Sequence, residues 1–196
     1  WSPGNQTTAS ITVSPQVTTT YTVTGTDANG CINTGTRTVT VNPLPTVSIA
    51  GTPTVCEGGS TLLTASGGVT YLWNTGQTTA AITAVPPANT TYRVTATDIN
   101  GCTATASVLV TVNPNPTASI SPTGPTNICQ DQTQTFTAST DLGNSYAWKR
   151  NNVIIGGATA SSYGATLSGD YKVIVSIMAT GCKDSSAVST LVVNPK

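Results

Sequence analysis

The stretch Tyr92-Arg93-Val94-Thr95-Ala96-Thr97-Asp98-Ile99-Asn100-Gly101-Cys102 decides the fold of this chain. Apolar and polar side chains alternate through its first half, which is typical of a β-strand with one buried face. The Asp-Ile-Asn-Gly segment favours a tight turn, because Asn and Gly tolerate a positive φ. A second alternating strand follows and ends at Asn113-Pro114, since proline has no N–H to donate to a strand ladder. The stretch is therefore predicted to open a β-hairpin.

The same hairpin pattern occurs three times. The other two copies run from Tyr21 to Pro43 and from Tyr171 to Pro195, and each copy ends in an Asn-Pro pair. A tryptophan precedes each hairpin. The spacings for Trp1–Cys31, Trp73–Cys102 and Trp148–Cys182 are 30, 29 and 34 residues. The chain is therefore predicted to be a tandem repeat with a period of about 75 residues.

Composition narrows the class of protein. Charged residues make up 7% of the 196 residues, histidine is absent, and seven acidic residues balance seven basic ones. Threonine, about a fifth of the chain, and valine suit half-exposed strands. We therefore expect an all-β chain with almost no helix and with no basic surface for nucleic acid. No apolar run approaches the length of a membrane span, so membrane insertion is not expected.

The repeat predicts three segments. Residues 46–115 and 116–196 each match a complete unit, whereas residues 1–45 match only its later half, strands C to G. The proline-rich stretches 43–45 and 113–116 are predicted to be short, stiff linkers. Strands are expected at 47–49, 54–56, 60–65, 69–73 and 80–85 before the second hairpin, and at 128–129, 133–138 and 146–148 before the third.

In the first segment, strands are expected from Trp1 and near Ile11 to Val13. A half sandwich leaves a strand edge and a core face uncovered. The first segment is therefore interpreted as part of a longer array. The alternative is a subunit that is completed by another chain.

Three positions in each complete unit carry a resemblance to a known family. They are a leucine or phenylalanine in the second strand, a tryptophan in the central strand and a tyrosine that opens the hairpin. The core markers are Trp1, Trp73, Trp148, Tyr21, Tyr92 and Tyr171. With the Asp-x-Asn-Gly-Cys turn and the Val-Asn-Pro ending, the pattern resembles bacterial Ig-like and PKD-type repeats of long secreted or surface proteins of Bacteroidota, exported by the type IX system. The resemblance implies a tandem array of small Ig-like β-sandwich domains outside the cell.

The five cysteines occupy two repeated positions. Cys56 and Cys129 lie early in a unit, whereas Cys31, Cys102 and Cys182 lie late. Without histidine or a Cys-x-x-Cys motif, zinc and redox chemistry are not expected. Paired cysteines in small β units predict an oxidising, extracellular compartment.

An Ig-like topology places Cys56 and Cys102 at opposite ends of one sandwich. Cys56 lies near the end where the strand of Tyr92 begins, and Cys102 lies ten residues beyond Tyr92. At about 3.3 Å per residue, the two cysteines are roughly 25–35 Å apart, whereas a disulfide needs Cα atoms within about 7 Å. Head-to-tail stacking instead brings Cys56 beside Cys182 of the next unit.

The favoured hypothesis is therefore a series of inter-domain disulfides. Cys56 pairs with Cys182, and Cys31, Cys102 and Cys129 pair with cysteines outside this segment, so that Cys31 stays unpaired within it. Intradomain pairs, Cys56–Cys102 and Cys129–Cys182, are the alternative if the topology departs from the Ig type. Free thiols are the third reading.

Other candidate sites have simpler interpretations. The turns at Asp27 and Asp98 offer one carboxylate each, too few oxygen ligands for calcium, so hairpin turns are preferred. The aromatic markers are interpreted as core residues in place of a sugar-stacking platform, and the threonine-rich strands as ordinary solvent-facing strands. The acidic residues are scattered over three units and histidine is absent, so no acid–base pair is evident. No enzyme, cofactor or metal is predicted.

The sequence predicts a structural role. The favoured function is a stalk or filament segment of a giant extracellular adhesin-like protein, which spaces a distal binding region from the cell surface. Neighbouring repeats of the same chain are its expected partners, and surface polysaccharide or other cells are partners of regions outside this segment. The alternatives are a carbohydrate-binding accessory module of a secreted hydrolase and a self-assembling fibre subunit completed in trans.

Overall fold

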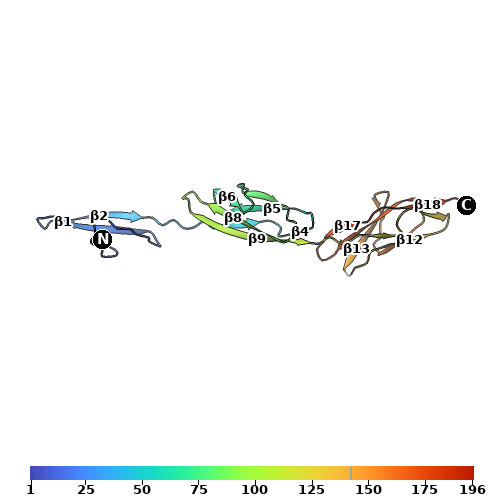
Figure 1. Ribbon diagram of the computed structural model, residues 1–196, viewed down its shortest axis with the longest axis horizontal. Helices are drawn as coiled ribbons and strands as arrows, with labels where there is room; N and C mark the ends of the chain where they lie inside the picture. Colours follow the sequence, from blue (N-terminus) through green and yellow to red (C-terminus); the bar gives the residue numbers. More distant parts are fainter. Residues whose placement is uncertain (142) are drawn as a thin grey trace. The chain divides into compact units, whose positions relative to one another are not determined.

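The computed structural model describes residues 1–141 and 143–196, and this part of the chain consists of strands and turns without a helix (Figure 1). Accordingly, none of these residues belongs to a helix long and apolar enough to cross a membrane. Residue contacts divide the chain into two compact units. The first comprises Trp1–Ala50, Thr64–Ala81 and Arg93–Ser107, and the second comprises Gly51–Leu63, Ile82–Tyr92 and Val108–Lys196.

The first segment forms one antiparallel hairpin from β1 (Thr19–Thr26) and β2 (Ile32–Val39). This is the hairpin that the repeat pattern predicts, and its register pairs Thr19 with Val39 and Thr26 with Ile32. Upstream of the hairpin, an isolated bridge joins Ser2 to Thr22.

The strands expected from Trp1 and near residues 11–13 do not form among the described residues. The physical reason is that a strand needs a hydrogen-bonded partner. In the middle repeat the strand equivalent to residues 11–13 is β7 (Ala81–Ala84), which pairs with β5 (Thr61–Ser66), and the first segment has no strand equivalent to β5. Trp1 and Tyr21, two of the expected core markers, are only half buried, in a segment whose core face was expected to be uncovered.

The middle repeat contains seven strands. They are β3 (Ser48–Ala50), β4 (Thr54–Cys56), β5 (Thr61–Ser66), β6 (Thr70–Trp73), β7 (Ala81–Ala84), β8 (Thr90–Thr97) and β9 (Thr103–Asn113). They form a sheet of order β3-β5-β7 and a sheet of order β4-β9-β8-β6, in which β4 is parallel to β9. Along β5, Thr61, Leu63 and Ala65 are buried and alternate with exposed residues, so their face of the strand points into the sandwich.

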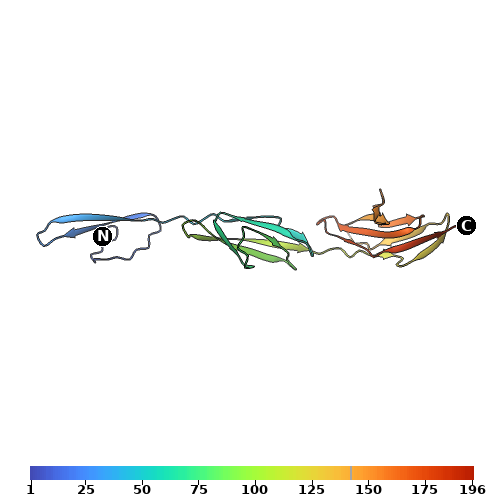
Figure 2. The same cartoon turned by 90° about the horizontal axis from the view of Figure 1, so that it is seen from above.

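The C-terminal repeat follows the same plan with longer turns. Its strands are β10 (Ile120–Ser121), β11 (Thr126–Cys129), β12 (Gln134–Ala138), β13 (Asn144–Arg150), β14 (Val153–Ile154), β15 (Ser162–Ala165), β16 (Gly169–Ile177), β17 (Lys183–Ser185) and β18 (Ser189–Asn194). One sheet has the order β10-β12-β15 and the other β11-β18-β16-β13-β14, with β17 paired to β16. Figure 2 shows these strands in two layers.

Aromatic residues fill the core of the C-terminal repeat. Phe136, Trp148 and Tyr171 are buried, and the ring centroids of Phe136 and Tyr171 are 5.1 Å apart. The Trp148 indole donates to the Ala160 carbonyl at 2.9 Å, so its polar atom is satisfied inside the sandwich.

The Tyr171 hydroxyl donates to the carbonyl of Leu167 at 2.8 Å, four residues upstream. This is the tyrosine corner of Ig-like domains. Burial raises the pKa of Tyr171, although the guanidinium of Arg150 acts in the opposite direction. The phenol therefore stays protonated and keeps its hydrogen bond at neutral pH.

The predicted fold class is confirmed. The chain is a tandem array of small Ig-like β-sandwiches. The middle repeat has the same core arrangement as the C-terminal one, with Trp73 and Tyr92 buried and the Trp73 indole donating to Thr79 at 2.9 Å. In the described part of the chain, each sheet takes all its strands from one of the three predicted segments.

Candidate functional site

A disulfide joins Cys56 of the middle repeat to Cys182 of the C-terminal repeat. The two Cα atoms are 5.5 Å apart, and the cysteines are separated by 126 positions in the sequence. Both belong to the second compact unit. This is the inter-domain pairing that the sequence analysis favoured. Because a cysteine forms only one disulfide, the intradomain alternative of Cys56–Cys102 and Cys129–Cys182 does not form in this structure.

Cys56 is held at the end of β4, whose Cα register pairs it with Asn113 at the end of β9. Val55 is buried, so strand alternation turns the side chain of Cys56 away from the core. Residues 56–59 then form a turn, named here the early turn, in which Gly59 N–H donates to the Cys56 carbonyl at 2.8 Å. Gly58 has a φ of 75°, which glycine adopts without steric cost.

Cys182 closes the turn between β16 and β17. This late turn, residues 177–182, has two backbone hydrogen bonds of 2.8 Å, from Ile177 to the Cys182 carbonyl and from Gly181 to the Ile177 carbonyl. Cys182 is fully buried, and its Sγ lies 3.9 Å from the Asn113 carbonyl oxygen. A disulfide sulfur carries no proton, so this is a packing contact. The late turn thus lies against the residue that ends β9.

The linker between the two repeats is held by a hydrogen bond near each of its ends, and these two bonds are called here the linker ties. Asn115 Nδ2 donates to the Glu57 carbonyl in the early turn at 3.1 Å. Just after the linker, Ala118 N–H donates to Asp184 Oδ2 in β17 at 3.3 Å. Both bonds are exposed to water, so each is worth about 1 kcal/mol or less. The covalent bond is therefore the strong connection at this junction.

The linker ties were not found by sequence reasoning. Asn115 belongs to a linker that the sequence marks only as stiff, and Asp184 lies in the short strand β17, which was not predicted. The available signal was the repeated Asn-Pro pair, which places the third linker residue next to the early turn. Sequence alone does not show what that residue contacts.

The other three cysteines are free thiols in this structure. Cys31 and Cys129 are exposed, and Cys102 is half buried. Cys129 ends β11 as Cys56 ends β4. Cys31 and Cys102 end turns equivalent to the late turn. The structure thus repeats both kinds of cysteine position and bridges one pair.

The Asp-x-Asn-Gly turns are built as hairpin turns. Asp98 Oδ1 accepts hydrogen bonds from the backbone N–H groups of Asn100 and Cys102, each at 2.8 Å. Asp27 accepts the equivalent pair of bonds in the first hairpin. Each carboxylate therefore stabilises its own turn. No group of three or more His, Cys, Asp or Glu residues that could hold a metal ion occurs in the described part of the chain.

The aromatic residues considered for a sugar platform lie in the cores. Trp73 and Trp148 are 2% and 0% exposed, and Tyr92 and Tyr171 are buried with them. The rings of Trp148 and Tyr171 lie against other aromatic rings of the C-terminal repeat. None of these four side chains offers a flat surface to a ligand.

No known protein-family model and no curated protein sequence matches the chain. Among solved structures, murine CEACAM1b is 18% identical over 76% of this chain and all of that chain, with a TM-score of 0.38. The three N-terminal domains of the outer capsid protein Hoc of bacteriophage RB49 are 17% identical over 76% of this chain and 59% of that one, with a TM-score of 0.39. An I-band fragment of titin is 14% identical over 79% and 67%, with a TM-score of 0.38.

Proposed function

We propose that the chain is a segment of an extracellular stalk or filament, in which successive Ig-like sandwiches are joined through disulfides. In this role it is a non-catalytic part of a long adhesin-like repeat protein and holds a distal binding region away from the cell surface. The observation that carries the proposal is the Cys56–Cys182 bond, which joins one repeat to the next.

The disulfide gives the two repeats a second covalent connection. A linker alone leaves adjacent domains free to reorient. Here the chain passes through residues 113–116 and is bridged in parallel between Cys56 and Cys182, next to the Asn113 carbonyl. Pro116 is buried and fixes its own φ, which further restricts the linker. Two covalent paths, one of them through proline, restrict bending and twisting at the junction.

The disulfide also supports an extracellular location. Structural disulfides persist in oxidising compartments and are rare in the cytosol. Small β-sandwiches with few core aromatics gain stability and placement from such bonds. An extracellular spacer needs the resistance to unfolding that such bonds give more than it needs a binding pocket.

The structure offers less support for a carbohydrate-binding accessory module. Such a module stacks exposed aromatic rings on sugars, and the tryptophans and tyrosines of the two complete repeats that mark the fold are used in the cores. The proposed spacer role needs only the sandwich, the linker and the disulfide, all of which are present.

One observation favours the fibre subunit completed in trans. The first segment has an apolar hollow of about 290 Å³ lined by Trp1, Ile11, Val13, Tyr21 and Val39, with three further residues. In a fibre, a strand of another chain would fill it. Light scattering of the oxidised chain with its free thiols alkylated separates the two roles, since a stalk segment is then expected to stay monomeric and a fibre subunit to polymerise as its concentration rises.

The stalk proposal predicts that the disulfide couples the motion of the two complete repeats. In solution NMR, the backbone amides of the two repeats are expected to share one rotational correlation time in the oxidised chain. In the C56S/C182S double variant they are expected to tumble separately, with shorter correlation times, because only the linker then joins the repeats. The C102S variant is the matched control, since it removes a cysteine and leaves the bond. Unchanged correlation times in the double variant would contradict a stiffening role.

A further inference from the structure

The early turn of the C-terminal repeat copies the one that carries the disulfide. β11 is parallel to β18, and its Cα register pairs Cys129 with Asn194. In the middle repeat the same register pairs Cys56 with Asn113. The residue after each cysteine donates its N–H to the paired asparagine, at 2.9 Å for Gln130 and 2.8 Å in the middle repeat. The backbone that presents the cysteine is therefore the same.

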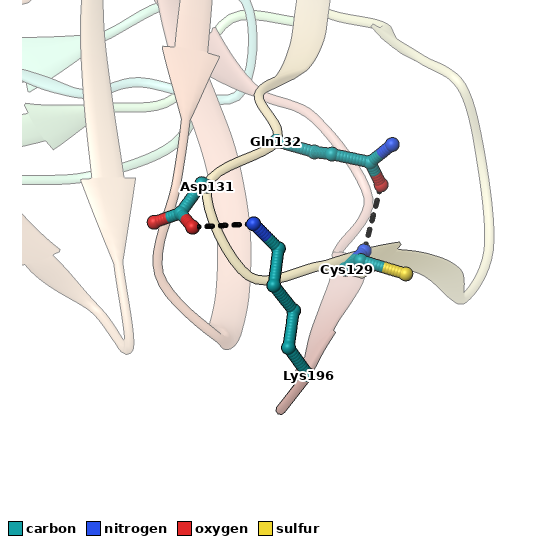
Figure 3. A network of polar contacts seen from close by, with 4 residues as sticks. All are labelled: Cys129, Asp131, Gln132 and Lys196. Atoms are coloured by element: carbon teal, nitrogen blue, oxygen red, sulfur yellow. Dashed lines mark hydrogen bonds and ion pairs between the residues drawn. The ribbon is translucent and has the colours of Figure 1, made fainter.

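This likeness holds although the turn sequences differ. Gln132 N–H donates to the Cys129 carbonyl at 3.1 Å and closes the turn, as Gly59 does after Cys56. Asp131 has a φ of 69°, close to that of the glycine at the equivalent place. The Gln132 side chain also accepts a hydrogen bond from Cys129 N–H at 2.7 Å (Figure 3). The turn after Cys129 therefore has the same backbone conformation as the turn after Cys56, although its residues differ.

The residue after the Asn-Pro pair is also tied to the early turn in both repeats. In the middle repeat this is Asn115, which donates to the turn backbone. In the C-terminal repeat it is Lys196, whose Nζ lies 2.8 Å from Asp131 Oδ2 (Figure 3). Both side chains of this ion pair are largely exposed, so it contributes little energy. The ion pair shows, however, that the chain passes the early turn at Lys196 as it does at Asn115.

The two early turns differ in what covers them. Cys56 is bonded to Cys182 in the late turn of the next repeat, and Cys182 is completely buried. Cys129 is an exposed free thiol. The C-terminal repeat thus presents one half of the junction that the chain contains in complete form.

The other half of the junction is also repeated. At the Asp98 turn, Asp98 N–H donates to the Cys102 carbonyl at 2.9 Å and Gly101 N–H to the Asp98 carbonyl at 3.1 Å. The Asp27 turn has the same two bonds. Gly101 and Gly181 share a positive φ, of 80° and 73°. A Gly-Cys hairpin turn is therefore the kind of structure that fits an early turn.

We propose that Cys129 and its early turn are the docking surface for the late turn of a further Ig-like repeat of this kind, and that the two cysteines form a disulfide. The inference rests on the proposed function, because it names the partner that continues the stalk. The bond forms by thiol–disulfide exchange with a small disulfide such as oxidised glutathione. Both protein thiols lose their protons, the new S–S bond joins them, and the oxidant leaves as two thiols.

This bond changes how a stalk bears tension. Cys129 lies between Cys56 and Cys182 in the sequence, so a bond from Cys129 to a later repeat interlaces with the loop already closed. Neither loop opens without breaking a disulfide. In a longer array, tension then passes from Cys182 back through 53 positions to Cys129, so each such repeat lengthens only by the extension of that segment.

The test extends the full chain by a second copy of residues 116–196 after Lys196, which repeats the Asn-Pro-x-Pro linker. The chain is refolded in reduced and oxidised glutathione, digested with trypsin without reduction and analysed by mass spectrometry. A C102S background leaves Cys129 as the sole cysteine of tryptic peptide 94–149. We expect this peptide to be linked to residues 173–183 of the added copy. Heavy-isotope labelling of the added copy by segmental ligation distinguishes it from the original.

The C129S variant is the control, since it is expected to lose this link and keep Cys56–Cys182. A free Cys129 in a folded, extended chain overturns the inference, and so does its pairing with Cys31. Because Cys56–Cys182 is read in the same digest, that failure is distinct from failure of the proposed function. If the added copy does not fold, a second extension with residues 46–115 offers Cys102 in its place, and an unlinked Cys129 there also overturns the inference.

Discussion

Pulled by its two ends, the oxidised chain is expected to extend by roughly 400–450 Å less than the reduced chain. Force applied at Trp1 and Lys196 passes from Cys56 to Cys182 through the disulfide, so the part of the chain between them carries no tension. That part spans 126 positions, at about 3.3–3.6 Å per residue when extended. The measurement is single-molecule force spectroscopy with handles at the two termini, before and after reduction.

The C56S/C182S variant supplies the control for the pulling experiment. Without reductant it is expected to give the long contour length of the reduced wild-type chain, because no disulfide then carries the force past residues 57–181. A C102S chain is expected to give the short one. Equal contour lengths for oxidised and reduced wild type would show that no bond connects the two repeats in solution.

The largest stability effect is expected from Trp148→Ala. Trp148 is 0% exposed, its ring lies 5.9 Å from Tyr163 and 6.5 Å from Phe136, and its indole N–H is used within the repeat. Removing a buried tryptophan leaves a large cavity and costs about 3–5 kcal/mol. The measurement is urea unfolding of the oxidised chain, followed on the methyl NMR signals of Val173 and Val175.

Trp1→Ala is the matched control, because Trp1 is half buried in a segment without a closed core. It is expected to change the stability of the C-terminal repeat by less than about 0.5 kcal/mol, since it lies in another segment. A loss below about 1 kcal/mol for Trp148→Ala would contradict the role of this tryptophan as the centre of the core.

Much of the fold could be predicted because its signals are local. Alternation in Tyr92–Thr97 and the Asn-Gly turn define a hairpin without knowledge of the rest of the chain. The Cys56–Cys182 pairing followed from one global argument. The length of the hairpin strand places Cys56 and Cys102 at opposite ends of a sandwich, so only a neighbouring repeat brings a cysteine to Cys56.

The failures arise where a local pattern needs a distant partner. Ile11 and Val13 alternate like a strand, but the strand at this place in a complete repeat, β7, pairs with β5, and the first segment has no equivalent of β5. Strand β14 was not predicted either. It pairs with β13 through an exposed two-residue hairpin turn at Asn151 and Asn152, with φ values of 49° and 65° that asparagine tolerates.

The equivalence of the early turns is the least visible feature of the sequence. Glu57-Gly58-Gly59 and Gln130-Asp131-Gln132 share no residue, yet both close the same turn after a cysteine. Strand register fixes that equivalence, and register depends on packing across the sheet. The three predicted segment boundaries remain a prediction, because the contact-based units divide the chain elsewhere.

The central claim is that a disulfide joins successive repeats, and a non-reducing tryptic map of the native protein tests it most directly. Cys56 is the sole cysteine of peptide 38–93, and Cys182 is the sole cysteine of peptide 173–183. We expect these two peptides to be recovered as one linked species that separates on reduction. Recovery of peptide 38–93 linked to peptide 94–149, in a form that the C102S substitution abolishes, would instead place the bond within the middle repeat and contradict the claim.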